Sequence, residues 1–175
     1  MKVPPNGTFF LNEKSDNQLK ITRLEVSTID KIRKLIEPVV EADGAFIIDI
    51  EIHGGKEGKS LQVYIDTDSG ISTQMCASIS RDLSKLIDEE NIFTSRYYLV
   101  VSSPGLDRPL KYFRQYRKNI GRTLKLKVKT DNKIENIQGV LSNVFDEEIT
   151  IKNSDSEEQN VKFSSIVEAI VETPW

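Results

Sequence analysis

Seven residues, Ser103 to Pro109, divide this chain into two halves whose hydrophobic periodicities differ. Pro104 fixes its own φ and Gly105 tolerates a positive φ, which is the combination that a type II turn requires. Arg108 precedes a proline and is therefore biased towards an extended backbone. The stretch predicts a stiff corner between two separately folded regions, although the turn alone is equally typical of an ordinary strand-to-helix connection.

The first half opens with a segment of mixed composition and then a helical pattern. Residues 1–20 have scattered charges, prolines and no periodicity, so we expect a tail or a docked extension. Apolar residues at helical spacing follow over 29–40. Ser27 or Thr28 is the expected N-cap of this helix and Gly44 its stop.

Strands and a second helix complete the first half. Alternating apolar residues at 46–52 and 61–66 predict a hairpin, and Ser72 is the expected N-cap of a helix that ends near residue 90. The apolar run 97–101 predicts a buried strand. Together these segments predict an αββαβ unit, with two helices on a three-stranded sheet.

The second half has a different pattern of apolar and polar residues. A short amphipathic helix is expected at 112–118, and after Gly121 the pattern changes to closely spaced strands. Five strands in roughly 55 residues are typical of a small β-barrel. The expected strands lie at 124–129, 138–144, 148–152, 160–163 and 168–171.

The fold class is therefore α+β, in four segments. We expect an N-terminal tail at 1–20, an α/β domain at 21–108, a basic linker at 109–119 and a small β-barrel at 120–175.

Charge is segregated along the chain, although the net charge is only −3. Residues 108–129 carry nine basic residues and no acidic one, whereas the segments on either side are acidic. A lysine-lined strand face is by itself most simply a solvated face that guards a sheet edge. With arginines and aromatic residues just upstream, binding of RNA phosphates becomes the favoured interpretation. The candidate RNA- or ribosome-binding residues are Arg108, Lys111, Arg114, Arg117, Lys118, Arg122, Lys125, Lys127 and Lys129.

The sequence offers no constellation for catalysis or metal binding. Cys76 is the only cysteine, which fits a reducing cytoplasm, and it is expected to be a small core residue. His53 is the only histidine and is expected in a solvated loop. The segment 66–70 resembles the start of a calcium loop but lacks the later glutamate. We therefore expect no enzyme, no cofactor, no metal and no membrane-spanning segment.

The run VVSSPGLDRPL at 100–110 resembles the signature of the RimP family of bacterial ribosome maturation factors. Further similar stretches, in the expected order, are IEPVVEADG (36–44), LQVYID (61–66), GIS…CASISRDLSKLIDEE (70–90) and IGRTLKLKVK (120–129). The chain departs from the family pattern in its N-terminal extension and in the more basic segment after Leu110. The family motif falls on Ser103, Pro104, Gly105, Leu106, Asp107, Arg108 and Pro109.

The resemblance implies a fold and a role. It implies an N-terminal α/β domain followed by an SH3-like barrel of the SH3/Sm-like class. It also implies a cytoplasmic protein that binds the free 30S subunit during ribosome biogenesis, without catalysis. Its expected partners are 16S rRNA and a small-subunit ribosomal protein, protein twelve, and we expect the protein itself to be a monomer.

Two other functions remain open from the residues. An Sm-like RNA-binding module outside ribosome assembly would use an exposed barrel edge to form rings, which the lysine-rich strand disfavours. A protein–protein adaptor would use the acidic α/β domain, with the basic segment incidental.

Overall fold

The computed structural model describes residues 13–55, 58–131 and 133–173, with side chains from Thr28 onwards. The order of elements confirms the predicted αββαβ unit in the first half. It consists of α1 (Glu13–Ala42), β1 (Phe46–Gly55), β2 (Gly58–Asp66), α2 (Thr73–Glu89) and β3 (Tyr97–Ser102).

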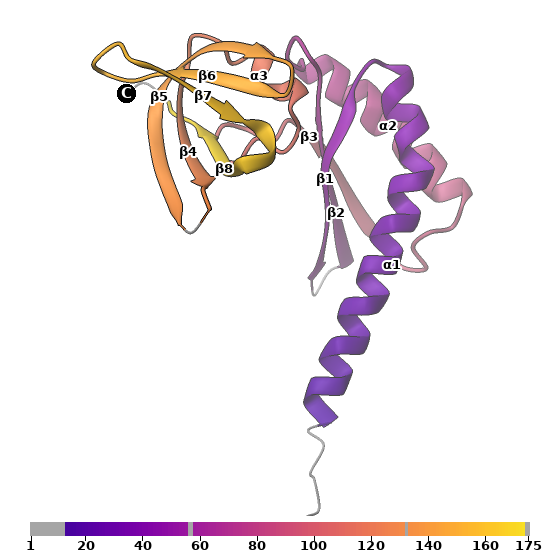
Figure 1. Cartoon of the computed structure of the whole chain (residues 1–175). Helices are drawn as coiled ribbons and strands as arrows, with labels where there is room; N and C mark the ends of the chain where they lie inside the picture. Colours follow the sequence, from indigo (N-terminus) through magenta and orange to yellow (C-terminus); the bar gives the residue numbers. More distant parts are fainter. Residues whose placement is uncertain (1–12, 56–57, 132, 174–175) are drawn as a thin grey trace, which may run out of the picture.

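The three strands form one sheet in the order β1-β2-β3. The strands β1 and β2 are an antiparallel hairpin, whereas β3 runs parallel to β2 because α2 carries the chain back along the sheet. Both helices lie on the same side of this sheet (Figure 1). Ser72 caps α2 as expected, since its hydroxyl oxygen accepts a hydrogen bond from the Met75 N–H at 3.2 Å.

The first helix begins much earlier than predicted. It starts at Glu13, inside the segment 1–20 that we assigned to a tail, so the expected N-cap at Ser27 or Thr28 is wrong. Residues 13–28 contain neither proline nor glycine, and nothing in the sequence interrupts the helix there. Residues 1–12 of the predicted tail lie outside the described residues. The helix ends at Ala42, and Gly44 stops it as predicted, with a φ of 73° and an N–H that donates to the Glu41 carbonyl at 2.9 Å.

The strand β3 is an edge strand, not the buried strand that its apolar composition predicted. Leu99 and Val101 pack against the core beneath the helices. Tyr98 and Val100 point to the other face of the sheet, and both are 44% exposed. A continuous apolar run does not reveal whether one face or both faces of a strand are covered.

The core of the first half lies between the sheet and the two helices. Its largest fully buried side chains include Ile32, Ile36, Leu61, Ile79 and Leu83. Cys76 packs against this core as predicted, and burial raises the pKa of its thiol, which keeps the thiol protonated and unreactive.

The second half contains the five expected strands. They are β4 (Thr123–Lys129), β5 (Ile134–Phe145), β6 (Glu148–Lys152), β7 (Glu158–Lys162) and β8 (Ile166–Val171), preceded by the short helix α3 (Arg114–Arg117). All pairings are antiparallel, and the order is β7-β6-β5-β4-β8. The structure therefore confirms a five-stranded antiparallel sheet. Closure of this sheet into a barrel is not confirmed, because no β7–β8 pairing joins its two edges in the described part of the chain.

The core of the second half extends into the predicted linker. Leu124, Leu126 and Val128 are buried on one face of β4, as their alternation with lysines predicted. Tyr116 of the linker is fully buried in the same core, where its ring lies 5.8 Å from that of Phe163. The segment 109–119 is thus packed into the second half. None of the helices within the described residues is long and apolar enough to cross a membrane.

Candidate nucleic-acid interface at the domain junction

The predicted corner lies between the two halves and is fastened to the second sheet. Gly105 has a φ of 71°, the positive value that the turn was expected to require. The N–H of Leu110 donates a hydrogen bond to the Ala169 carbonyl of β8 at 2.8 Å. Among the motif residues, Ser103, Gly105, Leu106, Asp107 and Pro109 are exposed, and Pro104 and Arg108 are half-buried.

Arg108 holds the corner against β1 and β2. Its Nη1 donates to Glu51 Oε1 at 2.8 Å and lies 3.7 Å from Asp49 Oδ2. Its guanidinium carbon lies 3.7 Å from the centre of the Tyr64 ring. The hydrogen bond from Arg108 is the main cause of a lowered pKa at Glu51, which is therefore ionised at neutral pH.

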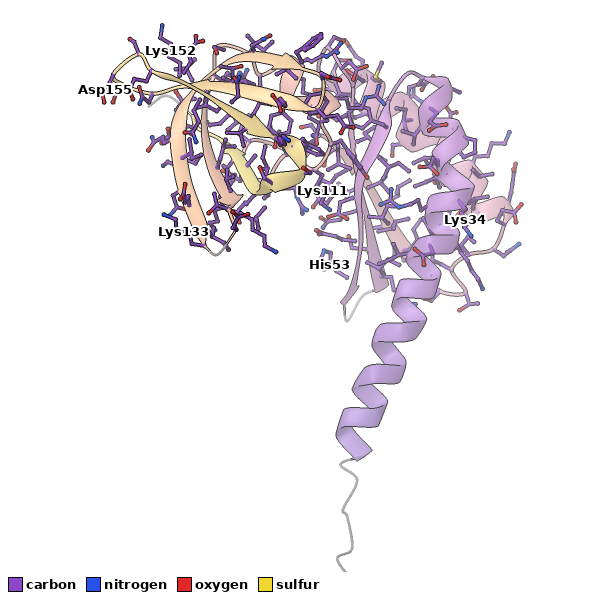
Figure 2. All side chains as sticks on the ribbon, in the orientation of Figure 1. Lys34, His53, Lys111, Lys133, Lys152 and Asp155 are labelled. Atoms are coloured by element: carbon purple, nitrogen blue, oxygen red, sulfur yellow. The ribbon has the colours of Figure 1, made fainter. Side chains whose placement is uncertain are left out.

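Lys111 and Arg114 make the next contacts with the first half. Lys111 Nζ lies 2.7 Å from Asp49 Oδ2, and Figure 2 places Lys111 between the two halves of the molecule. Arg114 binds both carboxylate oxygens of Asp68, at 2.7 and 2.8 Å, and lowers the pKa of that carboxyl. Its guanidinium carbon also lies 3.9 Å from the centre of the Phe46 ring.

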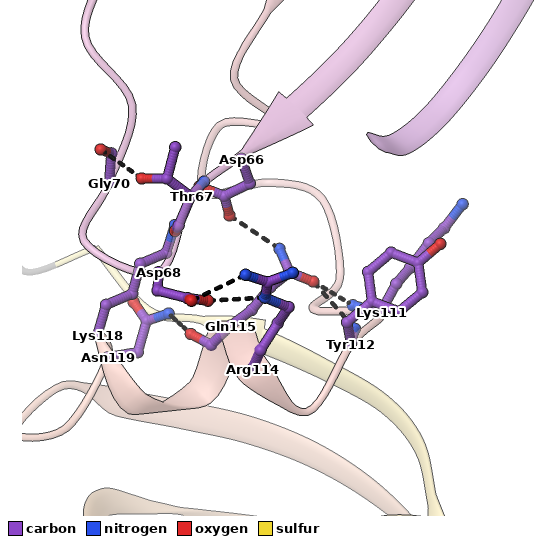
Figure 3. A network of polar contacts seen from close by, with 10 residues as sticks. All are labelled: Asp66, Thr67, Asp68, Gly70, Lys111, Tyr112, Arg114, Gln115, Lys118 and Asn119. Carbon is purple, nitrogen blue, oxygen red and sulfur yellow. Dashed lines mark hydrogen bonds and ion pairs between the residues drawn. The ribbon is translucent and has the colours of Figure 1, made fainter. Parts of the chain in front are cut away.

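Behind these contacts is a buried polar network that joins α3 to the end of β2 (Figure 3). Asp66 is only 3% exposed, and its carboxylate accepts hydrogen bonds from Lys118 Nζ and from Gln115 Nε2, the latter at 3.1 Å. Lys118 Nζ also donates to the Thr67 carbonyl at 3.1 Å. Gln115 Oε1 in turn accepts from the N–H groups of Lys111 and Tyr112 at 2.9 and 3.0 Å. The buried polar atoms of this network satisfy one another, which fixes the corner on the first sheet.

The lysine-lined face of β4 is not a row of free cations. The three lysines are exposed, as predicted, while the residues between them are buried. Lys125 Nζ lies 2.7 Å from Glu172, and Lys127 Nζ lies 3.1 Å from Glu168 of β8. The neighbouring strand thus supplies the counter-charges for two of the three lysines.

The nine predicted cations therefore fall into three groups. Arg108, Lys111, Arg114 and Lys118 contact acidic residues of the first half, and Lys125 and Lys127 contact acidic residues near the chain's last strand. Arg117, Arg122 and Lys129 are exposed and have no ion pair within 4 Å among the described residues.

Sequence reasoning missed the acidic partners of this site. In the sequence, Asp49 and Glu51 are polar positions of the strand expected at 46–52, and Asp66 and Asp68 lie in the segment 66–70 that resembles a calcium loop. The buried Gln115 was not singled out at all. The sequence did offer one signal for these ion pairs, because acidic residues precede the corner and basic residues follow it. The individual pairs could not be predicted, because the two partners are separated by 46 to 62 residues along the chain.

The first half is a three-stranded sheet with two helices, and a basic, tightly docked corner joins it to a five-stranded antiparallel sheet. Among the described residues, no group of three or more His, Cys, Asp or Glu side chains could hold a metal ion. Residues 35–107 match the family model of the RimP N-terminal domain. The resemblance to the RimP family that was identified from the sequence is thus confirmed over these residues. This family is one of non-catalytic ribosome maturation factors associated with the small ribosomal subunit.

Proposed function

We propose that this protein binds the free 30S subunit in the cytoplasm and assists its assembly without catalysing a reaction. The match of residues 35–107 to the RimP N-terminal domain carries the proposal. Segment 108–129, with nine cations and no acid, supports contact with 16S rRNA. Binding to one folded intermediate of the subunit stabilises that intermediate over others, which is a shift of populations by differential affinity.

Arg117, Arg122 and Lys129 are the first candidates for phosphate contacts, because they are exposed and without an ion pair in the described part of the chain. Lys125 and Lys127 follow, since they are exposed and their partners are half-buried carboxylates that a phosphate can replace. The first half, in which acidic residues outnumber basic ones, suits a basic ribosomal protein, for which protein twelve of the small subunit is the proposed identity. We further propose that the five-stranded sheet is of the SH3-like type.

The direct test is co-sedimentation of the purified protein with free 30S subunits and with 70S ribosomes. Binding to free 30S subunits alone supports the proposal. Binding to neither particle overturns it and leaves the adaptor function, which the six ion-paired cations favour.

A salt titration tests the RNA contact. Replacement of Arg117, Arg122 and Lys129 by Gln should reduce the slope of log K against log salt by about 2 to 3, at roughly 0.7 to 0.9 for each phosphate. A matched control replaces Lys31, Lys34 and Arg81, exposed cations of the helical side, by Gln. An equal change of slope in the two variants would show that RNA binding depends on the overall charge of the protein and not on these three positions.

A further inference from the structure

The contacts between the basic segment and the first half form two layers. We call Arg108–Glu51, Lys111–Asp49 and Arg114–Asp68 the outer pairs. We call the cluster of Asp66, Gln115 and Lys118 the inner network. The layers differ in their exposure to water. The two side chains are 48% and 64% exposed in the Arg114–Asp68 pair and 31% and 30% exposed in the Arg108–Glu51 pair, whereas in the Lys118–Asp66 pair they are 22% and 4% exposed.

This difference decides which contacts another anion can replace. An exposed ion pair contributes little net free energy, because both groups regain hydration when they separate. A phosphate offers the same paired oxygen acceptors as a carboxylate and is an equally good partner for arginine. The Asp66 carboxylate, by contrast, would be left buried with only the Thr67 N–H as a donor if the inner network opened, and that is costly.

The outer arginines also stay in place without their carboxylates. Arg108 is stacked on Tyr64 at 3.7 Å, and Arg114 is stacked on Phe46 at 3.9 Å. These contacts with aromatic faces hold each guanidinium plane at the surface of the first sheet whichever anion it binds. The outer pairs therefore present two oriented guanidinium groups on a junction that the inner network keeps closed.

We propose that the outer face of the domain junction is a phosphate-binding surface occupied by the protein's own carboxylates. RNA phosphates displace Glu51, Asp49 and Asp68 from Arg108, Lys111 and Arg114, while the inner network remains intact. The carboxylates make binding selective, because only an RNA backbone that places its phosphates to replace them is bound tightly. This inference rests on the proposed function, since it names a site for the same rRNA.

The test removes the competing carboxylates and keeps the cations. In the double variant Glu51→Gln and Asp68→Asn, the association constant for free 30S subunits and for a single-stranded polyuridine oligonucleotide should rise about 2- to 30-fold. That is the range expected from one exposed and one half-buried ion pair that water still reaches. Asp68→Asn alone, at the more exposed site, serves as a second test if the double variant unfolds at a lower temperature.

A matched control separates exchange at the junction from a general change of charge. Glu89→Gln and Glu135→Gln make the same change in net charge, and each also frees an exposed lysine, Lys85 or Lys133, away from the junction. An equal rise in affinity in this control would overturn the exchange. So would an unchanged affinity in the junction variant, provided that the wild-type protein binds. Failure of the wild-type protein to bind free 30S subunits would instead reject the proposed function itself.

Discussion

At the scale of single residues, Tyr116 buries a polar hydroxyl group in an unfavourable way. It is fully buried, and its hydroxyl has no hydrogen-bond partner within the described residues. Burial also raises the pKa of this hydroxyl far above its usual range. A buried polar group without a partner costs about 1 to 3 kcal/mol. Tyr116→Phe should therefore increase the free energy of unfolding by about 1 kcal/mol or more, as measured by urea denaturation.

Tyr97 provides the control for that substitution. Its hydroxyl donates a hydrogen bond to Asp88 Oδ1 at 2.7 Å. Removal of this hydroxyl in Tyr97→Phe should lower stability by about 0.5 to 1.5 kcal/mol. Equal effects of the same sign in the two variants would show that the Tyr116 hydroxyl does not carry the cost.

At the scale of elements, Gly139 of β5 lies very close to the neighbouring strand β6. A Cβ at this position would lie 2.4 Å from the Lys152 carbonyl oxygen and 2.7 Å from Ile151 Cγ2. Both atoms belong to the paired strand β6, so relief of the clash requires the ladder to shift. Gly139→Ala should lower the free energy of unfolding by about 1 to 3 kcal/mol in the same denaturation experiment.

Gly54 of β1 is the matching position in the first sheet. No heavy atom would lie within 4 Å of a Cβ there. Gly54→Ala should leave stability unchanged or raise it by a few tenths of a kcal/mol, because it only restricts the unfolded chain. A destabilisation as large as that of Gly139→Ala would contradict the explanation by close approach.

Most elements could be predicted because their information is local. The alternation of Leu124, Leu126 and Val128 with lysines defined β4, and Ser72 defined the start of α2. The exposed face of β3 was not predictable, because it depends on whether a layer covers the far side of the sheet. The acidic partners Glu168 and Glu172 of the lysines were not predictable either, because β8 pairs with β4 across a long stretch of chain.

At the scale of the whole molecule, the second core extends into the segment before residue 120. Leu110, Phe113 and Tyr116 pack into this core, although the sequence assigned them to a linker. We therefore expect a fragment of residues 109–175 to melt cooperatively and at a higher temperature than a fragment of residues 120–175. Equal melting temperatures would show that the linker residues do not stabilise the second core.

The junction also makes the whole molecule sensitive to acid. Arg108 and Arg114 lower the pKa values of Glu51 and Asp68 below their ordinary values of 4.5 and 3.8. Between the lowered and the ordinary pKa values, the folded protein therefore binds fewer protons than the unfolded chain. The stability that these ion pairs contribute is present above this pH range and is lost as the pH falls through the lowered pKa values. His53 Nε2 also lies 3.1 Å from Glu51 Oε2, and a protonated imidazole there stabilises the ionised carboxylate.

Melting temperatures recorded between about pH 6 and pH 3 check this expectation. The wild-type protein should lose stability steeply below about pH 4.5, whereas the variant with Glu51→Gln and Asp68→Asn should have a flatter profile. Parallel profiles for the two proteins would mean that other carboxylates determine the response to acid.

The distance along the chain between the two partners of each junction contact has a consequence for synthesis. The acidic residues of β1 and β2 precede their basic partners by 46 to 62 residues. At roughly 5 to 20 residues per second, a nascent chain carries these carboxylates for several seconds before their cations are made. The corner can therefore dock only after the strands that carry these carboxylates have been synthesised.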